Sequence, residues 1–211
     1  MMADRHAARS FAAIAFGAFL FHSVAAQGDE TADGARVFIA ELAEQANSLL
    51  VDESITPRER NARFRNMFVE SFDVPEVARF VLGRYWRKAK AEEREEYLRL
   101  FEELVVGTWA PRFADYDKDK FTIVGTRAET PDYARVSSVL SFGDSDLIRV
   151  DWWIGRQGDT YRIVDIVVEG ISMRVTHRSE FGSVIRSSGG RLEGLLQALR
   201  KKTKQLSLNA H

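Results

Sequence analysis

Apolar residues recur every three or four positions through the first half of the chain, which is the spacing of helices that bury one face. One such face lies within residues 35–51 and is formed by Phe38, Leu42, Ala46 and Leu49. The next helix is predicted to begin after Thr56, because Thr56 is a good N-cap and Pro57 and Glu59 suit the first and third helical positions. The first half of the chain is therefore predicted to be helical.

Two further helices are predicted before the middle of the chain. Asp73 is a suitable N-cap for a short helix that ends near Gly83. A long helix then begins at about Ala91, and its apolar face comprises Tyr97, Phe101, Leu104 and Val105. Pro111 falls inside this pattern. Since proline cannot donate the helical hydrogen bond and crowds the preceding turn, we expect the helix to bend or end there.

The spacing changes to alternation near Lys120, and alternation is typical of strands. Four strands are predicted at residues 121–127, 134–142, 147–154 and 161–168. The turns between them are short, so neighbouring strands are predicted to pair antiparallel. Gly170 interrupts the pattern because glycine readily takes a positive φ, and residues 171–175 are predicted to continue as a fifth strand. Helices at residues 179–186 and 191–202 complete an α+β fold.

The first residues have the features of a secretory signal peptide. Two arginines precede an apolar stretch at residues 11–21, which is too short to span a bilayer. Small residues at positions 24–26 suit cleavage. We therefore predict a signal peptide at residues 1–26, a single domain at residues 27–211 and a periplasmic location. An uncleaved N-terminal anchor is the alternative.

Composition and charge exclude several classes of site and partner. The 211 residues carry a net charge of −1, which argues against nucleic acid as a partner. The chain has no cysteine, and beyond the predicted leader its histidines are His177 and His211, so a histidine and cysteine metal cluster cannot form. The phosphate-binding loop, the dinucleotide fingerprint and the nucleophile elbow are also absent from the sequence. We therefore predict no metal, no cofactor and no catalytic residue.

Asp165 is a polar residue in the middle of an apolar strand. A carboxylate in that position requires hydrogen-bonded or charged partners. One interpretation is a general base at the bottom of a pocket. The other is a structural ion pair with Arg149 or Arg135 on a neighbouring strand. His177 is the second candidate base, but two neighbouring arginines disfavour the protonated form that it would have to adopt.

The predicted sheet is apolar over parts of both faces. One face carries Ile148, Val150, Trp152 and Ile154 on one strand and Val164, Ile166 and Val168 on another. Apolar residues on the opposite faces are Trp153, Ile163 and Val167. The residues alone leave two interpretations open: these side chains form a solid core, or they line an apolar cavity.

Two segments of the chain carry a family resemblance. One is YRIVDIVVEGISMRVTHRSEF at residues 161–181, and the other is VLGRYWRKAKAEEREEYLRLFEELVVGTWAPRFADY at residues 81–116. With the glycine pair and leucine-rich helix at residues 189–199, they resemble the MlaC family, the toluene-tolerance type auxiliary proteins of bacterial ABC lipid transporters. The resemblance covers roughly residues 60–200, and Pro111 departs from the family's usual pattern.

The resemblance implies a fold and a function. The fold is an NTF2-like curved antiparallel sheet of four to five strands, with N-terminal and C-terminal helices that enclose an apolar cavity. The function is that of a periplasmic shuttle that binds phospholipid and performs no chemistry, so it is not an enzyme. Its partners would be an inner-membrane ABC transporter complex and an outer-membrane lipoprotein complex, and its role would be to maintain outer-membrane lipid asymmetry. We expect the shuttle to be a monomer.

If the chain has the cavity that the resemblance implies, its apolar side chains are candidate lipid-binding residues. They are Phe72, Phe101, Val105, Trp109, Val136, Ile148, Val150, Trp152, Val164, Ile166, Val168, Ile171 and Met173. The cavity is expected to lie near the upper end of the usual range of about 300–1,000 Å³. Arg174, His177 and Arg178 are candidates for its rim.

Three alternatives to a phospholipid shuttle remain at this stage. A carrier of the same family associated with hopanoids would bind a polycyclic lipid. An NTF2-like isomerase or dehydratase would use Asp165 as its base. An exported adaptor would bind only other proteins.

Overall fold

The computed structural model describes residues 23–51, 54–113, 121–141 and 147–209. Its helices are α1 (Ser23–Val51), α2 (Pro57–Ser71), α3 (Val74–Leu82), α4 (Arg84–Lys88), α5 (Ala91–Phe113), α6 (Met173–Ser187) and α7 (Leu192–Asn209). Its strands are β1 (Thr122–Thr130), β2 (Tyr133–Leu140), β3 (Ile148–Gln157), β4 (Thr160–Val168) and β5 (Ile171–Ser172). The predicted α+β class is confirmed, with one open antiparallel sheet in the order β1-β2-β3-β4-β5.

The helix starts predicted from the sequence are confirmed at α2 and α3. Thr56 Oγ1 accepts a hydrogen bond from the Glu59 amide at 3.2 Å, and Pro57 occupies the first helical position. Asp73 Oδ1 accepts from the Glu76 amide at 2.9 Å. These caps satisfy amides that the first helical turn leaves without a backbone partner.

The first and the last long helix of the N-terminal half, α1 and α5, have ends that differ from those predicted from the sequence. Helix α1 begins at Ser23, so it is longer than the predicted helix and overlaps the end of the predicted signal peptide. The rest of that peptide, residues 1–22, lies outside the described residues. Helix α5 is described to Phe113, so Pro111 stands in its last turn. Within the described residues, no helix combines the length and the apolarity needed to cross a membrane.

The fifth strand is shorter than predicted. Strand β5 contains only Ile171 and Ser172, and the prediction that the strand continues to Val175 was wrong. Ser172 Oγ accepts a hydrogen bond from the Val175 amide at 3.2 Å, so this serine caps a helix that begins at Met173. The cap overrides the β-branched and apolar side chains that had suggested a strand.

The turn between β4 and β5 confirms the predicted break at Gly170. Its φ is 81°, and the φ of Glu169 is also positive at 48°. Glu169 donates its amide to the Arg149 carbonyl at 3.0 Å, and its carboxylate accepts from the Arg149 amide. These two bonds join the turn to the beginning of β3.

The C-terminal helix is longer than predicted. Helix α7 reaches Asn209, seven residues beyond the predicted end at Lys202. Gly189 and Gly190, with φ of 74° and 78°, form the reversal that separates it from α6. Arg200 therefore lies in the middle of α7, where it pairs with Glu96 of α5 at 2.7 Å and with Glu193 at 2.8 Å.

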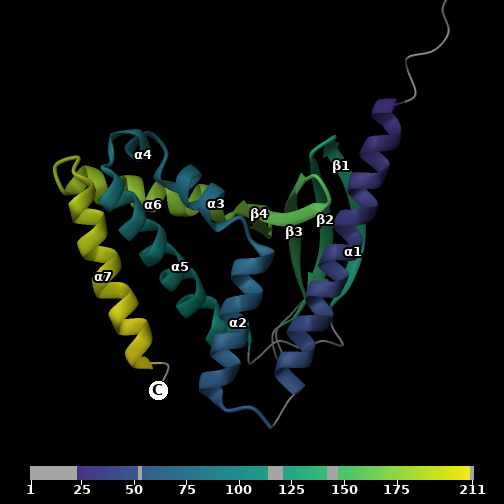
Figure 1. Ribbon diagram of the computed structural model, residues 1–211, viewed down its shortest axis with the longest axis horizontal. Coiled ribbons are helices and arrows are strands. Elements are labelled where there is room, and N and C mark those ends of the chain that lie inside the picture. Colours follow the sequence, from purple (N-terminus) through teal and green to yellow (C-terminus); the bar gives the residue numbers. More distant parts are fainter. Residues whose placement is uncertain (1–22, 52–53, 114–120, 142–146, 210–211) are drawn as a thin grey trace, which may run out of the picture.

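The buried side chains form two cores (Figure 1). The helical core holds α2–α7 together and includes Tyr97, Leu100, Phe101, Ile185 and Leu195. The sheet core lies between α1 and the sheet and consists of Ala35, Ile39, Ala134, Val136, Ile154 and Ile163. Figure 1 shows α1 across the sheet and the other helices beside it. The cavity described next lies between these two parts.

Both edges of the sheet have irregular pairing. Strand β1 is one edge, and its register with β2 shifts between Ile123 and Gly125 and again between Ala128 and Thr130. Strand β5 is the other edge and is only two residues long. The central strands β2 and β3 pair without a shift from Tyr133–Gly155 to Leu140–Ile148.

Candidate functional site

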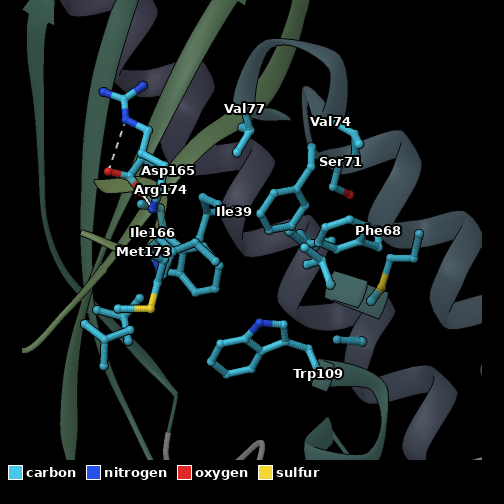
Figure 2. A pocket seen from close by; sticks show the side chains of 18 of the residues that line it. Ile39, Phe68, Ser71, Val74, Val77, Trp109, Asp165, Ile166, Met173 and Arg174 are labelled. Atoms are coloured by element: carbon cyan, nitrogen blue, oxygen red, sulfur yellow. Dashed lines mark hydrogen bonds and ion pairs between the residues drawn. The ribbon is translucent and has the colours of Figure 1, made fainter. Parts of the chain in front are cut away.

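An apolar cavity of about 460 Å³ lies between the sheet and the helices. Helices α1, α2, α3 and α5 line one side of it, and strands β2, β3 and β4 with the start of α6 line the other. Figure 2 shows Ile39, Phe68 and Trp109 from the helices facing Ile166 and Met173. The cavity is within the expected range but below its upper end, so the expected size was too large.

Most of the candidate lipid-binding residues lie in the cavity wall. Those that line it are Phe72, Phe101, Val105, Trp109, Ile148, Val150, Trp152, Ile166, Val168 and Met173. They come from helices and strands that are far apart in the sequence, and the two-sided closure of the fold brings them together. Whether they contact lipid stays a prediction.

The structure does not bring Val136, Val164 and Ile171 into the wall. Val136 is fully buried in the sheet core, because α1 covers that part of the sheet. Val164 lies at the register shift between β3 and β4 and packs beside Gly155. Ile171 is 59% exposed, because the turn at Gly170 carries it to the outside of the sheet edge.

N-terminal helices were expected to enclose the cavity, but the candidate residues did not include the side chains that α1 and α2 contribute to its wall. Helix α1 supplies Ile39, Leu42, Ala43 and Ala46, and α2 supplies Phe64, Met67, Phe68 and Ser71. Further lining residues are Val74, Val77, Phe121 and Leu140. The apolar faces of both helices were visible in the sequence, but periodicity alone does not distinguish a face on a solid core from a face on a cavity.

Trp152 is held in the wall by a hydrogen bond inside the sheet. Its indole Nε1 donates to Ser138 Oγ at 2.9 Å, and Ser138 Oγ in turn donates to the Val150 carbonyl at 3.3 Å. The indole N–H therefore has its partner within the protein, and the ring can present an apolar surface to the cavity. Trp152 is the largest side chain that β3 contributes to the lining.

Asp165 is bound by groups at the beginning of α6. Ser172 Oγ donates to its Oδ2 at 2.6 Å, and the Arg174 amide donates to its Oδ1 at 3.1 Å. Arg174 Nε lies 3.3 Å from Oδ2, so the predicted structural ion pair is confirmed with a different partner. The suggested partners were wrong, because Arg149 lies 3.6 Å from Asp151 and Arg135 lies 3.1 Å from Glu129.

These contacts leave Asp165 poorly suited to act as a general base. Both oxygens already accept hydrogen bonds from the protein, and the guanidinium of Arg174 lies beside one of them. Figure 2 shows the pair at one end of the cavity, with the guanidinium of Arg174 directed away from Trp109. The carboxylate instead fixes the start of α6 against β4.

Two of the three candidate rim residues line the cavity. They are Arg174 and His177, and they mark its polar end. The Arg174 guanidinium lies 4.5 Å from the centre of the Phe80 ring, and His177 Nδ1 lies 3.2 Å from a carboxylate oxygen of Glu180. Arg178 is outside the lining, and it donates to the Phe80 carbonyl at 3.3 Å.

A partly buried carboxyl group, that of Glu76, also lies near this polar end. Burial raises the pKa of Glu76, and the charge of Asp73 raises it further, while Arg174 opposes the shift. No group of three or more potential metal ligands occurs among the described residues. The arrangement thus offers a large apolar wall with a small charged end.

Three comparisons place these features among known proteins. The model of the MlaC protein family matches residues 40–201. The chain is 29% identical over 98 residues to the intermembrane phospholipid transport system binding protein MlaC of Haemophilus influenzae, and the match spans 44% of this chain and 45% of that protein.

The fold is also similar to a solved structure. It is the phospholipid-binding protein from Ralstonia solanacearum in complex with a phospholipid. The TM-score is 0.67 at 18% sequence identity, and the match covers 84% of this chain and 98% of that one. This similarity supports the common fold.

Proposed function

The chain belongs to the MlaC family, and we propose that it binds phospholipid as the carrier component of an intermembrane lipid transport system. The observation that carries this proposal is the apolar cavity of about 460 Å³ between the sheet and the helices. A protein of similar fold has been solved in complex with a phospholipid. The cavity supplies an apolar surface that suits acyl chains.

The physical task of such a carrier is to replace the bilayer as the surroundings of the acyl chains. Each methylene group that leaves water contributes about 0.8 kcal/mol. The wall must match the burial that a membrane offers without greatly exceeding it, since tighter binding would prevent release. Aliphatic and aromatic side chains without directed polar contacts suit this task, and the ten cavity-lining candidates are the residues that we expect to touch the acyl chains.

The proposed carrier acts in the periplasm. It would receive and deliver phospholipid at an inner-membrane ABC transporter complex and an outer-membrane lipoprotein complex, and so maintain the lipid asymmetry of the outer membrane. The sequence supports export through the signal peptide predicted at residues 1–26, which leaves residues 27–211 as a single lipid-binding domain. We expect it to work as a monomer and to perform no chemistry on its cargo.

Mass spectrometry of protein purified from a periplasmic extract tests the proposal. Native spectra should show one phospholipid per chain, and organic extraction should release a diacyl lipid. A polycyclic hopanoid in the extract would change the cargo but keep the carrier role. Protein that remains free of lipid over repeated preparations would contradict the proposal.

A further inference from the structure

Helix α4 and the residues after it form one of two strongly basic stretches of the described chain, and residues 200–204 on α7 form the other. The segment RYWRKAK at residues 84–90 has four cations and no acid, although the whole chain has a net charge of −1. Arg84, Arg87 and Lys88 are exposed. Positive charge is therefore locally concentrated at α4 on a protein that is close to neutral.

Helix α6 adds cations to the same surface. Figure 1 shows α4 above the part of the helical body where α6 and α7 meet. Arg84 Nη2 donates to Tyr85 Oη at 3.0 Å. This bond lowers the pKa of the Tyr85 hydroxyl, and the charges of Arg186 on α6 and Lys88 lower it further. The tyrosine oxygen thus lies in a field to which both helices contribute.

Arg178 connects this surface to the cavity. Its guanidinium packs against Gly83, just before α4, and lies 4.9 Å from the centre of the Phe80 ring. Arg174 lies 4.5 Å from the same ring and lines the cavity. Arg174 and Arg178 are four residues apart on α6, so they occupy adjacent turns of one helix face.

Among the described residues, no carboxylate pairs with the cations of this surface. We call Arg84, Arg87, Lys88, Arg178 and Arg186 the α4–α6 basic patch. In the described part of the chain none of the five forms an ion pair, whereas Arg200 on α7 has two glutamate partners. A cluster of charges that the protein leaves uncompensated is suited to an anionic partner.

We propose that the α4–α6 basic patch docks the protein onto the surface of an anionic phospholipid bilayer. The inference rests on the proposed carrier function, since a carrier must bring its cavity to a membrane. The patch pairs with headgroup phosphates, and the half-buried Tyr85 presents an aromatic ring with a polar tip that suits the headgroup region. Docking in this way places the polar end of the cavity, at Arg174, near the lipid headgroups.

Vesicle co-sedimentation tests the proposal with a triple variant, Arg84→Gln, Lys88→Gln and Arg186→Gln. The matched control is Lys201→Gln, Lys202→Gln and Lys204→Gln, which removes the same charge from exposed positions on α7. The full-length wild type should bind vesicles that contain phosphatidylglycerol and leave pure phosphatidylcholine vesicles unbound. Binding should weaken as salt rises toward about 0.15 M, where the screening length is about 8 Å.

The patch variant should partition on the order of 100-fold more weakly than the wild type, while the control should change little. Equal losses in both variants would show that only net charge matters and would overturn the proposal. Failure of the wild-type protein to bind anionic vesicles would also overturn the proposal. If patch substitution then slowed lipid exchange with the transporter complex, the patch would bind an acidic protein surface instead.

Native mass spectrometry of the same variants keeps this test separate from that of the carrier function. Lipid loading should remain normal in both, because none of the six substituted residues lines the cavity. Loss of vesicle binding with intact lipid loading supports docking through the patch. Lipid-free protein that still binds vesicles through the patch would contradict the carrier function while leaving the docking surface in place.

Discussion

At the scale of single residues, two polar side chains at the cavity, Asp165 and Trp152, have hydrogen-bond partners within the protein. Both carboxylate oxygens of Asp165 receive donors from the start of α6. The indole N–H of Trp152 is bound within the sheet. The wall therefore keeps its apolar character even where polar atoms stand close to it, because a satisfied polar group does not require water.

Replacing Asp165 by asparagine tests its structural role. Asp165→Asn keeps the volume but removes the charge that pairs with Arg174, so the free energy of unfolding should fall by about 1–3 kcal/mol. Urea unfolding measures the change, with Asp132→Asn in an exposed turn as the control. Lipid loading should survive. An unchanged unfolding midpoint would show that the pair contributes nothing to stability.

A charge at Trp152 should prevent lipid binding. Trp152→Glu puts a carboxylate into the apolar wall, where it lacks a partner and opposes burial of the acyl chains. Native mass spectrometry should find the folded variant without lipid, while Val124→Glu on an exposed position of β1 should load normally. Circular dichroism checks that both variants fold. A folded Trp152→Glu protein with full lipid content would refute the placement of this residue in the binding site.

Tyr97 makes stability depend on alkaline pH. Its side chain is fully buried, burial raises its pKa well above the ordinary value, and its hydroxyl donates to the Ala78 carbonyl at 3.0 Å. Above about pH 10 the unfolded chain releases this proton while the folded chain keeps it, so the unfolded state gains stability as pH rises. Urea unfolding should therefore show a steeper alkaline loss for the wild type than for Tyr97→Phe. Parallel pH profiles would contradict the assignment.

At the scale of elements, α1 lies so close to the sheet that a side chain at Gly34 would require the Tyr161 ring to move. A Cβ on Gly34 would collide with the ring of Tyr161 on β4, which also stacks on Phe38 with ring centres 6.4 Å apart. Helix α1 covers the sheet core and lines part of the cavity. A larger side chain at Gly34 should therefore affect how the whole of α1 packs on the sheet.

A double-mutant cycle tests this contact. Gly34→Ala should destabilise the protein by about 1–3 kcal/mol through overpacking. Tyr161→Leu should leave room for the added methyl group, so the double variant should be more stable than the sum of the single changes predicts. Thermal unfolding measures all four proteins. Additive effects would mean that the helix adjusts without cost.

The sequence predicted most of the helices and strands, but it predicted less accurately where they begin and end. The caps at Thr56 and Asp73 and the glycine turn at Gly170 are local chemistry, and each stands where it was predicted. The start of α6 was missed because the β-branched and apolar residues after Gly170 suggested a strand, whereas Ser172 caps a helix and also donates to Asp165, seven residues earlier. The length of α7 was missed because its last turns pack on α5 across a large sequence distance.

The cavity itself was less predictable than its wall. Alternation along β3 identified Ile148, Val150 and Trp152, which do line it. The same alternation could not show that α1 covers Val136 or that a register shift displaces Val164, since both depend on packing between distant elements. Apolar periodicity reports which side of an element is buried but not what buries it.

At the scale of the whole molecule, the cavity separates two cores. The sheet core with α1 and the helical core each bury their own side chains, and Leu42 and Phe72 pack against both. At the packing density of a protein interior, 460 Å³ holds on the order of 15–20 methylene groups. That is about one long acyl chain, so we expect the two parts to move apart when a diacyl lipid binds.

Distance measurements between the two parts test this expectation. The chain has no cysteine, so Glu95→Cys on α5 and Val124→Cys on β1 provide two exposed sites for spin labels. The separation between the labels should increase when delipidated protein takes up phospholipid. A pair of labels at Glu95 and Lys201, both within the helical part, should show no change. Equal separations with and without lipid at the first pair would mean that the cavity fills without widening.

The irregular edges of the sheet have a consequence for the protein at high concentration. An open edge with regular, unpaired backbone groups is a template on which a second chain can add a strand and begin a fibre. Here β5 is too short to offer such a template, and β1 breaks its register at two places and carries Arg127 and Glu129 near its end. If the two parts move apart during cargo exchange, neither edge of the sheet then offers a neighbouring chain a regular strand to extend.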